Sequence, residues 1–135
     1  MAKPRFLTVE EVKALHRMQI EQFGGSHGLR DEELLKSALA QPRQGAFGQY
    51  FHPSLGSMAA AYLYHIVKNH PFIDGNKRTG FAAADTFLGL NGYDLADSQE
   101  HFDMVSCVAN GQMNKDEIAL HLNNFVEPMD VPEIL

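Results

Sequence analysis

Residues 54–90 read SLGSMAAAYLYHIVKNHPFIDGNKRTGFAAADTFLGL, and this stretch determines the architecture. Apolar side chains recur at spacings of three and four on both sides of a short interruption. Within the interruption, Pro71 pushes the residue before it toward an extended conformation, and Asp74-Gly75 is a turn signal. The pattern predicts two long helices, over 54–69 and 76–90, joined by a break.

Two further helices are predicted before this stretch. Thr8 and Glu11 form a capping box, because each side chain can satisfy a backbone donor that the first helical turn leaves unpaired. The helix that begins there ends at Gly24-Gly25. Asp31 then caps a short helix, and Pro42 stops it.

The region after the central stretch predicts two more helices. Asp97 with Glu100 is a second capping pair, and Asn114 with Glu117 is a third. Each pair precedes a run of spaced apolar residues, so each is expected to cap the start of a helix. We expect residues 128–135 to form a loose tail.

The segment from Gln41 to Pro53 differs from the rest of the chain. It holds glycines and aromatic residues without a helical period, which predicts a loop or a small hairpin flap. The only strands that we expect are short ones within this flap. The fold class is therefore all-α: a single compact bundle of about six helices with a short flap or hairpin before the central helix. We expect one domain over 1–127, followed by the tail.

Composition limits the classes of function. The chain has 135 residues, of which 44% are hydrophobic and 21% charged, as in an ordinary soluble globular protein. It has 11 Lys and Arg against 17 Asp and Glu, and this balance argues against general nucleic-acid binding, which depends on neutralising phosphates. The single cysteine, Cys107, favours a reducing compartment, and no stretch approaches a membrane span. We expect a cytoplasmic protein that does not associate with membranes.

The break itself, HPFIDGNKR over 70–78, concentrates groups that can do chemistry. Lys77 and Arg78 fall in the first turn of a helix, where the dipole makes each cation cost about 0.3–1 kcal/mol unless an anion offsets it. Free backbone N–H groups at Gly75, Asn76 and Lys77 point the same way, so the helix start predicts a phosphate-binding turn.

Two residues of the break can complete a reaction centre. The Asp74 carboxylate is a hard oxygen ligand, and Mg²⁺ typically combines one or two carboxylates with phosphate oxygens, which implies a nucleotide. A neutral His70 imidazole can accept a proton from an attacking hydroxyl near neutral pH. These parts match phosphoryl-type transfer. Phe72 and Ile73 are expected to anchor the loop in the core.

Other interpretations of these residues remain open. The break could be a solvated connection between helices, without chemistry. His65 and His70 could ligate a metal, although the sequence offers no cysteine nearby and no His-Glu-x-x-His pattern. Surface or packing roles are expected for the five remaining histidines: His16, His27, His52, His101 and His121.

The segment from 70 to 78 resembles the signature of the Fic/Doc family, and is most similar to its death-on-curing branch, the toxins of type II toxin–antitoxin modules. The resemblance covers nearly the whole chain and includes GGSHGLRD at 24–31. It implies that His70 is the catalytic base, that Asp74 ligates Mg²⁺ and that Arg78 holds a nucleotide phosphate. The turn residues Gly75, Asn76 and Lys77 are expected to bind the anion. The expected catalytic residues are His70, Asp74, Lys77 and Arg78. The resemblance also implies that the flap, within 43–52, pairs with a target segment and presents its hydroxyl.

Departures from the family pattern distinguish two activities. Adenylyl-transferring members have glycine where this chain has Lys77, and a second arginine where it has Phe81. Both differences favour an ATP- and Mg²⁺-dependent protein kinase of the Doc type, with the γ-phosphate facing the base and elongation factor Tu as the implied target. Gly75 instead matches the transferases, so adenylylation of a protein hydroxyl is the alternative.

The sequence also indicates how the activity is restrained. Self-inhibited relatives carry Ser or Thr, three residues, then Glu and Gly or Asn, and this chain has no such string, so restraint is expected from an antitoxin in trans.

A nucleotide-binding regulatory module without turnover would not need His70 or Asp74. A nuclease is disfavoured by the single carboxylate and the acidic balance.

Overall fold

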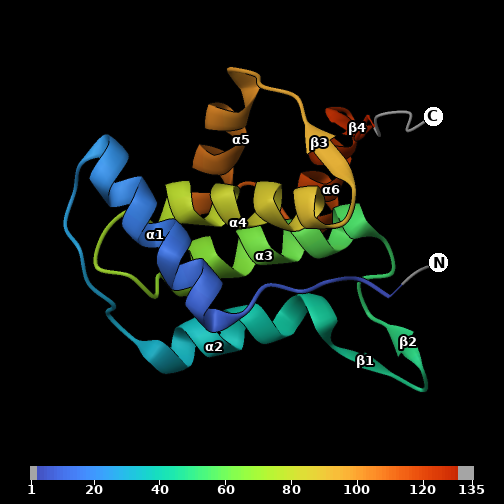
Figure 1. The fold of residues 1–135 in the computed structure, drawn as a ribbon, viewed down its shortest axis with the longest axis horizontal. Helices are drawn as coiled ribbons and strands as arrows, with labels where there is room; N and C mark the ends of the chain where they lie inside the picture. The colour runs from blue at the N-terminus through green and yellow to red at the C-terminus, as the bar shows by residue number, and fades with distance from the viewer. Residues whose placement is uncertain (1–2, 131–135) are drawn as a thin grey trace, which may run out of the picture.

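The computed structural model describes residues 3–130, and within them six helices form the bundle shown in Figure 1. This confirms the all-α class. The helices are α1 (Val9–Phe23), α2 (Glu32–Ala40), α3 (Leu55–Asn69), α4 (Asn76–Leu90), α5 (Glu100–Ala109) and α6 (Lys115–Asn123). A 3₁₀ turn, Gln41–Arg43, follows α2.

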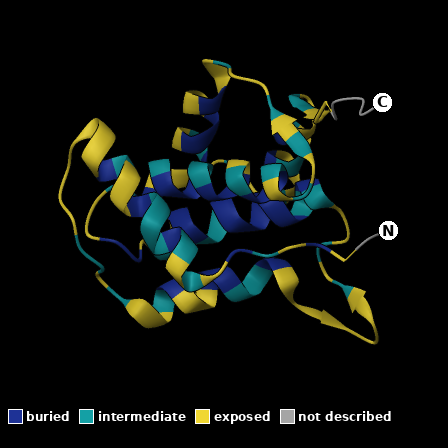
Figure 2. Cartoon of the chain, viewed as in Figure 1, coloured by how far each residue is buried: buried dark blue, intermediate teal, exposed yellow. Residues whose placement is uncertain are grey.

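Helix α3 is the centre of the bundle, and it is buried along most of its length (Figure 2). The alanines at 59–61 are fully buried, so neighbouring helices approach its backbone closely. Gly80 of α4 shows how close: a Cβ atom there would lie 2.9 Å from Val67 Cγ2 and 3.2 Å from the backbone oxygen of Leu63. The pair α3 and α4 therefore forms a rigid support for the segment that joins them.

The capping boxes predicted at Thr8 and Asn114 are confirmed, but the one predicted at Asp97 is wrong. Gln99 precedes α5 without a side-chain cap. The N–H of Glu100 donates instead to the hydroxyl oxygen of Ser98 at 3.1 Å, while His101 N–H bonds the Ser98 backbone oxygen. The chain thus enters α5 through a tight turn that places Ser98, and not Asp97, beside the first free N–H.

Two antiparallel strand pairs accompany the helices in the described chain. The predicted hairpin is confirmed as β1 (Gly45–Ala46) and β2 (Gln49–Tyr50). The pair of β3 (Tyr93–Leu95) and β4 (Val126–Pro128) was missed, because strands of three residues carry no readable period. Pro128, where the loose tail was expected to begin, is part of β4, and residues 131–135 lie outside the described residues.

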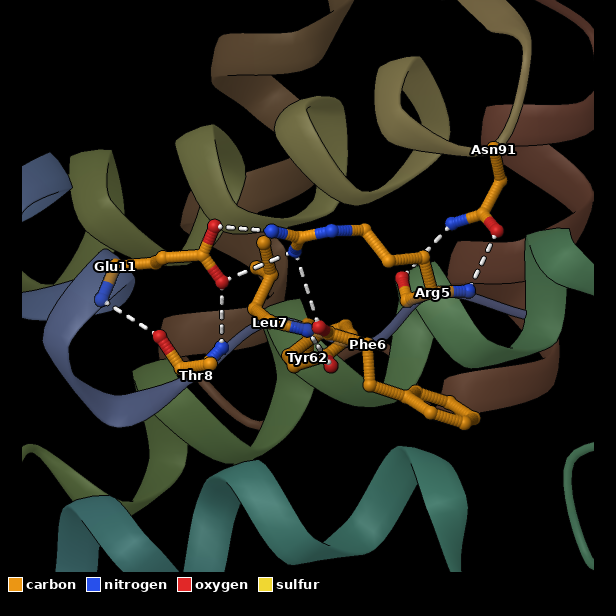
Figure 3. Close-up of polar contacts among 7 residues, drawn as sticks. All are labelled: Arg5, Phe6, Leu7, Thr8, Glu11, Tyr62 and Asn91. Carbon is orange, nitrogen blue, oxygen red and sulfur yellow. Dashed lines mark hydrogen bonds and ion pairs between the residues drawn. The ribbon is translucent and has the colours of Figure 1, made fainter.

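The segment before α1 is hydrogen-bonded to α1, to α3 and to the residue that ends α4 (Figure 3). The Arg5 guanidinium donates to both carboxylate oxygens of Glu11, at 3.0 and 2.8 Å, and this bond lowers the pKa of Glu11 to about 2. Leu7 N–H donates to the hydroxyl of Tyr62 at 2.9 Å, and Asn91 donates to Arg5 O at 3.0 Å. These bonds fix where α1 starts, and so where its far end meets the loop between α3 and α4.

The hairpin and the segment between α3 and α4 lie at opposite ends of α3 (Figure 1). A helix of 15 residues is about 22 Å long, so the two ends of α3 that these segments adjoin are about that far apart. The hairpin is therefore not beside the candidate site, contrary to the expectation that it presents the target there. Within residues 3–130, none of the helices combines the length and apolar character that crossing a bilayer requires.

Candidate active site

His70 ends α3 in the left-handed conformation, with φ 52° and ψ 53°. This corrects the expected extended backbone. Pro71 does remove the right-handed helical region from His70, as predicted. His70 N–H nevertheless still donates to Ile66 O, at 3.2 Å, so the chain turns sharply instead of extending. A left-handed residue other than glycine is uncommon and persists only when its surroundings hold it.

Arg30 supplies much of that hold. Its Nε–H donates to the backbone oxygen of His70 at 2.7 Å, and its Nη2 donates to that of Asn69 at 3.0 Å. The backbone N–H groups of Arg30 and Asp31 both donate to Pro71 O, at 2.7 and 3.0 Å. The segment before α2 is thus bonded along the loop that carries the candidate base, although no periodic signal in the sequence indicated this.

The loop is closed on its inner side by Asn76. Its side-chain oxygen accepts from Phe72 N–H, and its amide nitrogen donates to Phe72 O, both at 2.9 Å. Phe72 is buried as expected, but Ile73 is 54% exposed and does not anchor the loop. Because the Asn76 side chain is used inside the loop, only its backbone N–H can serve the predicted phosphate-binding turn.

Asp74 is exposed at the mouth of the loop, and both of its carboxylate oxygens are bonded. Oδ2 accepts from Ser26 N–H at 3.0 Å, and Oδ1 accepts from Gly75 N–H at 2.8 Å. The bond from Ser26, then that from Gly75, lowers the pKa of Asp74, so the group is an anion near neutral pH. The Gly75 N–H is therefore already occupied, which corrects its expected role as a free phosphate donor.

The start of α4 keeps three other N–H groups for an anion. The first intrahelical bond is donated by Thr79 to Gly75 O at 2.9 Å, so the N–H groups of Asn76, Lys77 and Arg78 precede it. Such a helix start attracts anions through its dipole and its free donors. The predicted anion turn is thus displaced by one residue along the helix.

Arg78 joins this turn to the end of α1. Its Nη1 donates to Gln19 O at 3.3 Å and its Nη2 to Gly24 O at 2.9 Å. A guanidinium carries five N–H donors, so these two bonds orient the group and leave others for a phosphate.

A pocket of about 310 Å³ brings the predicted residues together. The four predicted catalytic residues, His70, Asp74, Lys77 and Arg78, all line it. Its other lining residues are Val67, Ile73, Gly75, Asn76 and Ala109, of which Ala109, from the end of α5, was not foreseen. His65 is not part of the pocket, and its Nε2 lies 3.1 Å from Lys115 Nζ.

His16 was also missed as a residue of this region. It is buried on α1 and its Nε2 lies 2.8 Å from the backbone oxygen of Asp74. Its ring stacks on Phe72 at 3.9 Å, with 5° between the ring planes. The spacing of four from Val12 to His16 and to Ile20 placed it on the buried face of α1, which was the available signal.

Comparison with known proteins gives a consistent result. The model of the Fic/DOC family matches residues 6–88, more than half of the chain. A relative named "Toxin Doc", from Mycolicibacterium smegmatis, is 42% identical over 106 residues, which cover 76% of this chain and 82% of the relative. Another, named "Protein kinase doc", from Escherichia phage P1, is 30% identical over 115 residues, which cover 85% of this chain and 90% of the relative.

Proposed function

The chain belongs to the Fic/Doc family, and from that premise we propose that it is a Doc-type toxin that phosphorylates a protein. In this proposal it transfers the γ-phosphate of ATP to a Ser or Thr hydroxyl of its target. The observation that carries the proposal is the shared pocket, in which a histidine, an ionised carboxylate and a cationic helix start face one space. Phosphoryl transfer depends mainly on such positioning and charge stabilisation.

The reaction would use His70 as the general base. The target hydroxyl oxygen attacks the γ-phosphorus, and its proton passes to the imidazole. The bond from the γ-phosphorus to the bridging oxygen breaks, and ADP leaves with the electron pair. Lys77, Arg78 and the free N–H groups at the start of α4 would hold the phosphate oxygens.

Asp74 fits the role of a Mg²⁺ ligand. Its carboxylate is ionised and exposed at the pocket, and its two N–H bonds leave further oxygen lone pairs. Within residues 3–130, no group of three or more potential ligands gathers to form an all-protein cage. This suits a cation held by one carboxylate and by the phosphates of the nucleotide. Such an ion would neutralise phosphate charge.

Two residues support phosphoryl transfer over adenylyl transfer. Lys77 lines the pocket, and adenylyl-transferring members of the family have glycine at this position. Phe81 stands in place of their second arginine, and its ring lies 4.9 Å from that of His101, away from the lining of the pocket. A nucleotide with its γ-phosphate toward His70 would therefore meet the cationic side chains. Gly75 favours the alternative, adenylylation of a protein hydroxyl, which the experiment below distinguishes.

We propose elongation factor Tu as the first target to test, and a cytoplasmic antitoxin, acting in trans, as the restraint. The relative from Mycolicibacterium smegmatis is named a toxin, which supports an antitoxin partner, and that from phage P1 is named a protein kinase, which supports phosphorylation of a protein.

Intact-mass analysis of elongation factor Tu, after incubation with this protein, Mg²⁺ and ATP, tests the proposal. We expect the gain of one phosphate, and no gain with His70→Ala. A gain of AMP would replace the kinase assignment with adenylylation. No gain would exclude this target, and a bacterial lysate with γ-labelled ATP would then decide whether the chain phosphorylates any protein.

A further inference from the structure

His16 contacts the loop at one backbone atom, the oxygen of Asp74. A carbonyl oxygen only accepts, so the Nε2 atom at 2.8 Å must carry the proton. The ring is 3% exposed and lies nearly parallel to that of Phe72, which Asn76 holds through two bonds. The direction of the Nε2–H donor is therefore fixed by packing on one side of the loop.

This bond determines which way the peptide group between Asp74 and Gly75 faces. In a trans peptide the C=O and the N–H point in opposite directions. With the oxygen turned inward to His16, the Gly75 N–H is turned outward, where it donates to Asp74 Oδ1 at 2.8 Å. One peptide group thus links the buried imidazole to the carboxylate at the mouth of the pocket.

The same peptide group is one that can rotate easily. Gly75 has φ +77°, and glycine adopts φ of either sign at little cost. A rotated peptide would place a carbonyl oxygen where the N–H now lies, beside the Asp74 carboxylate and the anion turn. Two oxygens would then repel each other, and both would repel a phosphate. The rotated orientation would therefore spoil the anion site, and the contact from His16 adds to the bond from Gly75 N–H to Asp74 Oδ1 in favouring the observed one.

We propose that His16 is a positioning residue that holds the peptide between Asp74 and Gly75 in the orientation required for activity. It acts through the Nε2–H donor and not through its bulk. The orientation of this peptide group is a property of the chain alone, whereas the effect of the orientation on turnover rests on the proposed function. His16 does not line the pocket that His70 and Arg78 share, so it is not itself a catalytic residue.

Two variants separate the donor from the bulk of the side chain. His16→Phe keeps a planar ring to stack on Phe72 but has no donor, whereas His16→Gln keeps an N–H donor near the Nε2 position but has no ring. We expect His16→Phe to lose about 10²-fold in kcat/KM, which is the scale of a small misplacement at a reaction centre. We expect His16→Gln to keep a much higher kcat/KM than His16→Phe, even if His16→Gln has the lower thermal midpoint. Gln22→Phe, at an exposed residue of α1, is the control.

Nuclear magnetic resonance tests the structural part without any turnover. In the unmodified chain, ¹⁵N spectra should show His16 as the Nε2–H tautomer, and the Gly75 amide signal should move in His16→Phe but stay near its original position in His16→Gln. An Nδ1–H tautomer would overturn the proposal, even if neither variant folds. The proposal would also be overturned if the two variants lost kcat/KM in proportion to their loss of stability, with His16→Phe more active than His16→Gln. If no protein is phosphorylated by the unmodified chain, the proposed function fails, and the spectra still decide the role of His16.

Discussion

The Nε–H of Arg30 donates to the backbone oxygen of His70 at 2.7 Å, across 40 residues of sequence. A second donor of the same guanidinium reaches Asn69 O at 3.0 Å, so the planar fork binds two consecutive carbonyls at the end of α3. The bond holds His70 in a backbone conformation that residues other than glycine seldom adopt. Placement of the candidate base thus depends on a residue of the segment before α2.

Arg30→Ala should therefore reduce the rate of transfer more than it reduces nucleotide binding. We expect kcat to fall by as much as about 10²-fold, because the imidazole is displaced while the start of α4 is untouched. Arg30→Lys should be only a partial substitute, since an ammonium cannot reproduce the fork. The measurements are kcat by phosphoprotein formation and the Kd of MgATP by calorimetry. An unchanged kcat in Arg30→Ala would contradict this role.

His70→Ala should abolish transfer and spare nucleotide binding. The substitution removes the base but leaves Lys77, Arg78 and the N–H groups of α4 in place. Calorimetry with MgATP and mass analysis of the target report the two properties separately. Retained turnover would remove His70 from the role of base, whatever the affinity.

Arg78→Ala should weaken MgATP binding, by about tenfold or more, because it removes a charge-assisted phosphate contact. It should also lower the thermal midpoint, because the guanidinium bonds Gln19 O and Gly24 O at the end of α1. Lys77→Ala is the useful comparison, since that side chain is exposed and should affect affinity but not stability. Unchanged affinity in Arg78→Ala would mean that the helix start does not hold the phosphate.

Asn76→Ala should destabilise the fold by about 1–3 kcal/mol, because it leaves the buried Phe72 N–H and C=O without their side-chain partners. Urea denaturation gives this difference in the free energy of unfolding. Asn124→Ala, at an exposed residue, is a control that should stay near the unmodified value. Equal stability of the two variants would show that the bonds to Phe72 contribute little.

Stability should fall in mild acid because of His65. Burial, and then the neighbouring Lys115, lowers the pKa of His65 to about 4, while the unfolded chain has the ordinary value near 6.5. The unfolded state therefore binds the proton more readily, and the stability present above pH 6.5 is lost as the pH falls toward 4. Urea denaturation from pH 7.5 to 4.5 should show this loss, and His65→Gln should reduce the slope. Equal slopes in both proteins would refute the assignment.

The sequence by itself determined the helices, the break between the two central ones and the four polar residues His70, Asp74, Lys77 and Arg78 that line the pocket. It could do so because these features are local: apolar spacing, capping side chains and the nine residues from 70 to 78 all act over a few positions. The missed strand pair of β3 and β4 shows the limit, since each strand is short and its partner lies far along the chain.

Only the tertiary structure decided how the pocket residues are held. Nothing local to the break indicated that Arg30 would bind His70 O, that Ser26 N–H would bind Asp74, or that His16 would face the next peptide group. These bonds join segments that packing brings together, and their energy depends on direction and burial, which spacing does not encode. The chemical groups of the site thus lie within nine consecutive residues, whereas hydrogen bonds from α1 and from the segment that follows it determine how these groups are oriented.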